Sequence, residues 1–227
     1  MKQILLTLIL AAGLAPDAGA TIVYHVSLNT TPLIGNVAGP FSIDLQLVGN
    51  QGTAVTVSLI TFGGGSQTGV GNCFFNCTGD LSTVVSMNAA SGFFNEFYQT
   101  FAPGASLLFD VAFANVIPPP GGGPNGPDAF SFAILDSSLN EIPMQAGNGS
   151  FLTISLDSAT SPTVMLNSND PSGSPVIGVI NAPSVTSVSG IPEPGSIWLA
   201  GAALVLLAAL YQGRQLQSLN AERNMER

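Results

Sequence analysis

The chain is nearly free of cationic side chains. Its 227 residues include four Lys and Arg residues against thirteen Asp and Glu residues, and the formal net charge is −9. Residues 3–213 contain no Lys or Arg at all. Proteins that bind nucleic acid neutralise its phosphates with Lys and Arg. The composition therefore excludes nucleic acid as a partner, and the same region offers no basic group for an anionic substrate.

Groups for acid–base or covalent catalysis are also scarce. The single histidine, His25, lies in an apolar run, and a structural role is expected because a base alone forms no catalytic constellation. The glycine-rich stretch GGGSQTG lacks the Lys of a phosphate-binding loop and predicts a turn. Asp44 and Asp110 are expected to face outward, where they could share a face, but outward carboxylates on strands are most often solvated. The only tryptophan, Trp198, lies outside the domain, so a glycosidase would lack its usual aromatic platform. We predict a protein that is not an enzyme and needs no cofactor.

Cysteine is limited to two residues, Cys73 and Cys77, in GNCFFNCTG. A structural zinc site needs four ligands, and the chain has no further cysteine to supply them. In an exported protein the pair predicts a local disulfide, with free thiols as the alternative. The enclosed loop is so short that the bond is expected to hold a turn and not the whole fold.

Helical periodicity is absent before residue 197, and short alternating runs take its place. In PFSIDLQLVG, for example, apolar residues alternate with Ser42, Asp44 and Gln46, which is typical of a half-buried antiparallel strand. Clusters of Gly, Pro, Asn and Ser separate the runs. The pattern predicts an all-β fold, a jelly-roll-like antiparallel β-sandwich over residues 21–167. Its expected core includes Phe41, Ile43, Leu45, Val57, Phe109, Val111, Phe113, Phe132 and Ile134.

Residues 1–20 have the pattern of a secretory signal peptide. Lys2 supplies a positive start, residues 4–14 are apolar, and Ala18-Gly19-Ala20 matches an A-x-A cleavage site. The pattern predicts cleavage after Ala20 and export of a chain that begins at Thr21. The alternative is an N-terminal membrane anchor.

The other end of the chain carries a second apolar run. Residues 168–190 are rich in Ser, Pro, Asn and Gly and predict mostly a linker, with room for one edge strand. Residues 197–211 form the run, which as a helix is about 22 Å long, shorter than the ~30 Å hydrocarbon core of a bilayer. Arg214 and the polar residues 215–227 are expected to stay on the cytoplasmic side. A helix that tethers the exported domain to the membrane is therefore predicted, and a buried core helix is a poorer alternative.

The order of Pro192, Glu193, Pro194 and Gly195, a short apolar helix and Arg214 resembles the PEP-CTERM sorting signal of bacterial exported proteins. The resemblance covers residues 191–214. It implies recognition by an exosortase, a membrane-embedded transpeptidase-like cysteine enzyme, with cleavage near the motif and transfer to the envelope or the exterior. Such proteins tend to accompany exopolysaccharide production. The resemblance thus implies a non-enzymatic surface or extracellular-matrix protein, associated with biofilm or extracellular polysaccharide.

The alternative is a glycan- or calcium-binding β-sandwich on a plain single-span anchor. Exposed aromatic residues on one face would favour glycan binding, and the run FFNEFYQTF is the best candidate, although such a run is more often core. Its aromatic residues are Phe93, Phe94, Phe97, Tyr98 and Phe101. Oxygen ligands for calcium gather, without D-x-D-x-D spacing, around Asn125, Asp128, Asp136 and Asn140.

Overall fold

Alternating apolar residues build the strands of this chain, as the sequence predicts. A computed structural model describes residues 21–90, 93–116, 126–145, 149–173 and 177–189. One sheet has six strands in the order β13-β1-β9-β3-β7-β6. Their bounds are β1 Ile22–Asn29, β3 Ala54–Thr61, β6 Cys77–Gly79, β7 Val84–Asn88, β9 Ser106–Ala114 and β13 Ser184–Ser189.

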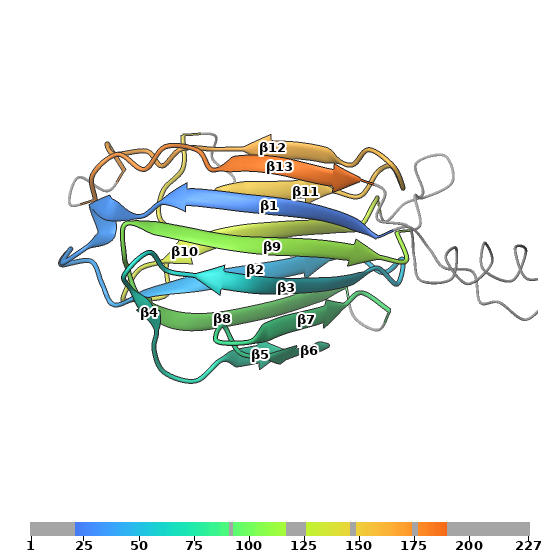
Figure 1. The fold of residues 1–227 in the computed structure, drawn as a ribbon, viewed down its shortest axis with the longest axis horizontal. Coiled ribbons are helices and arrows are strands. Elements are labelled where there is room, and N and C mark those ends of the chain that lie inside the picture. The colour runs from blue at the N-terminus through green and yellow to red at the C-terminus, as the bar shows by residue number, and fades with distance from the viewer. Residues whose placement is uncertain (1–20, 91–92, 117–125, 146–148, 174–176, 190–227) are drawn as a thin grey trace, which may run out of the picture. The chain divides into compact units, whose positions relative to one another are not determined.

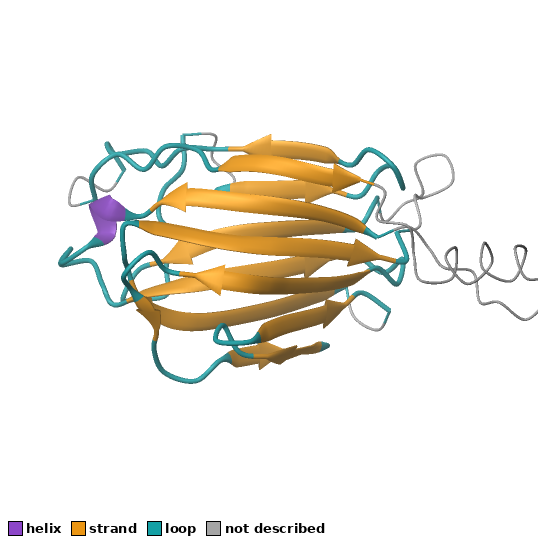
Figure 2. Ribbon diagram, in the orientation of Figure 1, coloured by secondary structure: helices purple, strands orange, loops and turns teal. Residues whose placement is uncertain are grey.

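The second sheet has seven strands. Six follow the order β12-β11-β10-β2-β8-β4, and β5 also pairs with β8. Their bounds are β2 Phe41–Val48, β4 Ser66–Gln67, β5 Asn72–Phe74, β8 Phe94–Ala102, β10 Ala129–Leu135, β11 Leu152–Ser155 and β12 Thr163–Leu166. All pairings in both sheets are antiparallel. Within the described ranges the helical structure is one 3-10 turn, Thr31–Leu33 (Figure 2).

The two sheets pack face to face around one apolar core. Figure 1 shows β1, β9 and β3 lying over β10 and β2 of the other sheet. Aromatic contacts join the layers, with ring centroids 5.1 Å apart for Phe109 and Phe132 and 5.8 Å apart for Phe113 and Phe130. All nine residues predicted for the core are buried, so that prediction is confirmed.

Strand β2 differs from the half-buried strand that its alternation predicts. It lies between β10 and β8 in the sheet, and both of its faces are largely covered. Ser42 and Asp44, expected at a solvated surface, are each 1% exposed. The sequence pattern distinguishes inner from outer positions, but it carries no information about what covers the outer face of a central strand.

The structure corrects the prediction that residues 168–190 are mostly a linker, because much of the described part of this segment belongs to the sandwich, and the one edge strand allowed for there is β13. Ile177 and Ile180 are buried in the core, and Asn169 is 0% exposed. The Asn169 side chain accepts from the Ile180 amide at 2.7 Å and donates to the Gly178 carbonyl at 3.1 Å. Strand β13 then pairs with β1 at the edge of the six-stranded sheet. Hydrogen bonds to one buried amide side chain fix this polar segment, and such bonds leave no hydrophobic periodicity in the sequence.

One compact unit comprises residues Thr21–Gly190. The predicted signal peptide, with Ala18 and Ala20, and the predicted tail helix, residues 197–211, lie outside the described residues. Within the described part of the chain, no helix has the length and apolarity that a bilayer crossing requires.

Candidate functional site

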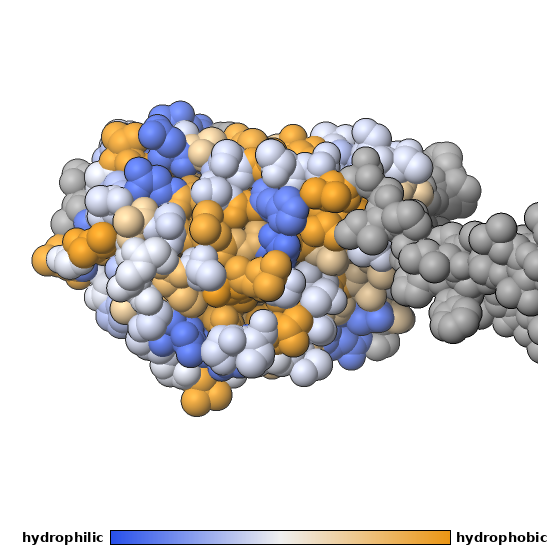
Figure 3. All heavy atoms as spheres, in the orientation of Figure 1, coloured by the Kyte–Doolittle hydropathy of each residue, from blue (hydrophilic) through white to orange (hydrophobic). Residues whose placement is uncertain are grey.

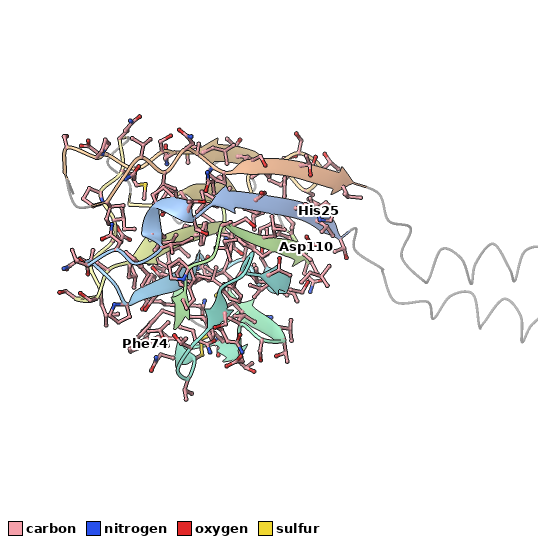
Figure 4. All side chains as sticks on the ribbon, turned by 60° about the vertical axis from the view of Figure 1, so that its left-hand side comes forward. His25, Phe74 and Asp110 are labelled. Carbon is pink, nitrogen blue, oxygen red and sulfur yellow. A yellow bond between two sulfur atoms is a disulfide. The ribbon has the colours of Figure 1, made fainter. Side chains whose placement is uncertain are left out.

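His25 and Asp110 form a pair on the outer face of the six-stranded sheet. They lie opposite each other on β1 and β9, with the His25 Nδ1 atom 2.6 Å from Oδ1 of Asp110 (Figure 4). A carboxylate can only accept, so Nδ1 carries the proton and donates it. Among the described residues no hydroxyl is hydrogen-bonded to the other ring nitrogen, Nε2. The pair has the base and orienting acid of a catalytic triad without a positioned nucleophile.

The surroundings of this pair are partly apolar. A hollow of about 370 Å³ adjoins it, and Leu59, 71% exposed, and Leu108, 40% exposed, line the hollow. Leu59 has φ 53 at an irregularity in the pairing of β3 with β9, which turns its side chain outward. Figure 3 views this face and shows apolar surface gathered near its middle.

Asp44 and Asp110 do not form the carboxylate pair that a shared face would allow. Asp110 is on β9 and Asp44 is on β2, so the two residues belong to different sheets. Asp44 lies opposite Tyr98 of β8 and Ala133 of β10. Gln46 donates to its Oδ2 at 2.7 Å, whereas Oδ1 has no hydrogen-bond partner in the described part of the chain. Burial, and next the nearby Glu96 carboxylate, raises the pKa of Asp44 to about 7.

The residues considered for calcium hold turns in place. Asp128 is 1% exposed, and its two carboxylate oxygens accept from the amides of Gln51 and Thr53 at 3.0 and 3.2 Å. Asp136 accepts from two amides of its own turn, those of Ser138 and Asn140. The fourth residue of the proposed set, Asn125, lies outside the described ranges. In the described ranges no three His, Cys, Asp or Glu residues are grouped so that they could hold a metal ion.

The run FFNEFYQTF is mainly a core strand. Phe97 and Phe101 of β8 are buried, Phe94 and Tyr98 are half-buried, and Phe93 is exposed. On the same face of β8, Asn95 precedes Phe97 and Gln99 lies between Phe97 and Phe101, and both amide side chains are 0% exposed. The sequence alone did not single out these two amides, although an Asn and a Gln at the inward positions of an apolar strand are the signal that could have revealed them.

Both buried amides hold the segment between β4 and β7. Asn95 accepts from the Asn76 amide at 3.0 Å and donates to the Leu47 carbonyl at 3.4 Å. Gln99 accepts from the Leu81 amide at 2.9 Å. Its amide nitrogen donates to the Gly69 carbonyl at 3.2 Å and to Asp80 at 2.8 Å. These bonds attach residues 68–83, the excursion that contains β5 and β6, to the edge of both sheets.

A disulfide hairpin projects from this excursion. A disulfide joins Cys73 and Cys77, the pair for which the sequence predicts one. Two exposed phenylalanines occupy the enclosed loop, Phe74 at 51% and Phe75 at 73%. Phe74 stacks on Tyr98 with ring centroids 6.3 Å apart, and Figure 4 shows it well away from His25 and Asp110. Phe75 has φ 62, a backbone conformation that bulky residues rarely adopt.

Beside the hairpin, the outer face of β3, β7 and β6 is hollow. The hollow measures about 590 Å³ and is open on one side. Thr56, Ser86 and Thr78 lie opposite one another on the three strands and form a row across its floor. Ala54 and Asn88 form the next pair. Small side chains on three adjacent strands produce the depression, and Phe75 stands at its rim.

The predicted sorting residues cannot be placed beside these sites. Pro192, Glu193, Pro194, Gly195 and Arg214 all lie outside the described residues. Their role rests on the sequence pattern.

No family model, curated protein or solved structure matches the chain.

Proposed function

We propose that this chain is an exported, non-enzymatic protein of the bacterial cell envelope or extracellular matrix, sorted by its C-terminal signal. The proposal is carried by one observation: Pro192-Glu193-Pro194, a short apolar run and Arg214 occur on a chain that begins with a signal-peptide pattern. The partners are an exosortase, the membrane through residues 197–211, and extracellular polysaccharide. The cargo is the antiparallel sandwich, of jelly-roll-like type.

The arrangement of the sandwich supports the proposal. The first and last strands of the domain pair directly, with Ile22 opposite Ser189. The first and last described residues of the domain, Thr21 and Ser189, therefore lie at the same edge of the six-stranded sheet. Along the sequence, only Gly190 and Ile191 separate β13 from Pro192.

Mass spectrometry of the C-terminal peptide tests the sorting role. In a host with an active exosortase, the mature protein is expected to lack peptides that contain Trp198 and Arg214. Replacement of Pro192, Glu193 and Pro194 by alanine is expected to leave export intact and to retain the tail, because the prolines keep the motif extended and accessible.

A second triple-alanine variant, at Gln215, Leu216 and Gln217, serves as the matched control and is expected to be processed like the unaltered chain. Persistence of the tail in hosts with and without the exosortase would leave a plain single-span anchor as the explanation. The sorting proposal then fails.

A second candidate function is glycan binding by the sandwich. The hollow over β3, β7 and β6 favours it, because hydroxyl groups and an exposed aromatic ring meet there. Calcium binding receives less support, since the carboxylates of Asp128 and Asp136 already accept from backbone amides.

A further inference from the structure

The hollow over β3, β7 and β6 presents unused hydrogen-bonding groups. Thr56, Ser86 and Thr78 form no side-chain hydrogen bond within the described residues, although their register places the three hydroxyls in one row. Each hydroxyl can donate once and accept twice. The three hydroxyls are therefore available as hydrogen-bond donors and acceptors for a ligand.

The lining of the hollow carries no charge. It consists of hydroxyl, amide, apolar and aromatic residues together with Cys77 of the disulfide, and no Asp, Glu or His contributes to it. The domain around it has acidic residues but no Lys or Arg. Such a site has no counter-charge for a phosphate, sulfate or uronate group, and the surrounding acidic field repels those groups. A neutral, hydroxyl-rich ligand fits this lining.

Phe75 supplies an aromatic platform at the rim. Its ring is 73% exposed, and the disulfide and the hydrogen bond from the Asn76 amide to Asn95 hold the backbone around it. A platform fixed before binding costs less ordering entropy than a mobile loop. The apolar C–H face of a sugar ring packs on an aromatic face, while its hydroxyls bond to nearby polar groups.

We propose that this hollow binds a neutral polysaccharide, with a sugar ring on Phe75 and the adjoining hydroxyls on Thr56, Ser86 and Thr78. Its volume of about 590 Å³ falls in the range of about 300–1,000 Å³ found for small-ligand sites. Its open side lets a polymer enter and leave, so an internal segment of a chain can bind. The inference deepens the glycan-binding candidate above by assigning the residues and the ligand class, and it does not require tail processing.

An array of neutral and uronate-containing oligosaccharides tests the site with the full chain in detergent. The unaltered protein is expected to bind neutral members. Phe75→Ala is expected to weaken that binding at least about 10-fold, and Ser86→Ala about 2- to 10-fold, the range for one net hydrogen bond. Phe75→Tyr keeps the ring and is expected to keep the affinity.

Phe74→Ala is the matched control. Phe74 is the same residue type on the same hairpin, but it stacks on Tyr98 and does not line the hollow. This variant is expected to bind as the unaltered chain does, and unchanged melting of the Phe75 variants shows that they are folded. Failure of every neutral oligosaccharide to bind, preference for uronates, or binding that Phe75→Ala leaves unchanged overturns the inference.

Tail processing is measured separately, by the C-terminal peptide in the same preparations. An unprocessed tail with neutral-glycan binding rejects the sorting proposal alone, whereas a processed tail without such binding rejects this inference alone.

Discussion

At the scale of single residues, Asp44 is an acidic side chain that its position in a central strand buries. Its side chain alternates outward from the core, yet it is 1% exposed on a central strand. Burial is the main cause of its raised pKa, and the Glu96 carboxylate adds to it, so this acid is protonated near neutral pH more readily than a solvated aspartate. The domain keeps a costly group in a place where a neutral one would be easier to bury.

We expect Asp44→Asn to change the pH dependence of stability. The folded pKa of about 7 lies above the unfolded value near 3.9, so the folded state holds the proton over a wider range. The contribution of Asp44 to the free energy of unfolding is therefore largest below about pH 4 and is lost as the pH rises through 7, by about 4 kcal/mol in total. The asparagine variant lacks this titration, so its free energy of unfolding relative to the unaltered chain should rise between pH 4 and pH 8.

Urea unfolding at pH 4, 6 and 8 measures the effect. Parallel stability profiles for the two proteins would contradict it. Gln46→Ala is a useful comparison, since Gln46 donates to the Asp44 carboxylate but does not itself titrate.

At the scale of elements, the excursion between β4 and β7 depends on buried amides. It contains two strands, β5 and β6, of three residues each, which are too short to be stable by themselves. Asn95 and Gln99 replace apolar contacts at the inner face of β8 with hydrogen bonds to this segment. The same bonds fix the hairpin that carries Phe75.

We expect Gln99→Leu to destabilise the domain by about 1–3 kcal/mol. The leucine has a similar size but leaves the Leu81 amide and the Gly69 carbonyl without this partner. Thr100→Val is the control, because Thr100 follows on the same strand and its hydroxyl donates to Thr68 at an exposed position. Chemical denaturation compares the two variants, and equal losses would argue against a special role for the buried amide.

At the scale of the whole molecule, the domain ends at β13 and not at residue 167. Strand β13 covers the edge of β1, and the segment before it places Ile177 and Ile180 in the core. Strands β1 and β13, at the two ends of the domain's sequence, thus stabilise each other by pairing. In the sequence, the predicted sorting motif begins three residues after Ser189, without the long linker that composition predicts.

Truncation tests this boundary. A chain of residues 21–190 is expected to unfold cooperatively. A chain of residues 21–167 loses the edge pairing of β1 and two buried isoleucines, so its free energy of unfolding is expected to be lower by several kcal/mol. Such a loss is a large part of a typical stability of about 5–15 kcal/mol. Thermal unfolding followed by circular dichroism measures the difference, and a chain of residues 21–183 isolates the share of β13. Equal melting temperatures for the longest and shortest chains would restore the linker interpretation.

The sequence by itself determined the all-β class, the long strands and the inward residues. Alternation is a local property: in β9, the residues Leu107, Phe109, Val111 and Phe113 face the core because successive side chains point to opposite sides. The sequence also identified the cysteine pair, which needs only proximity along the chain. For the tail, its pattern remains the sole basis of the sorting proposal.

Tertiary structure decided what depends on contacts between distant segments. The burial of Asp44 depends on the neighbours of β2. The conformation of residues 168–173 and 177–189 depends on the hydrogen bonds of Asn169 and on pairing with β1. The hollow requires that Thr56, Ser86 and Thr78 meet in register on three strands. Sequence spacing does not encode strand order or register between distant segments, because these are set by which faces the whole chain can bury together.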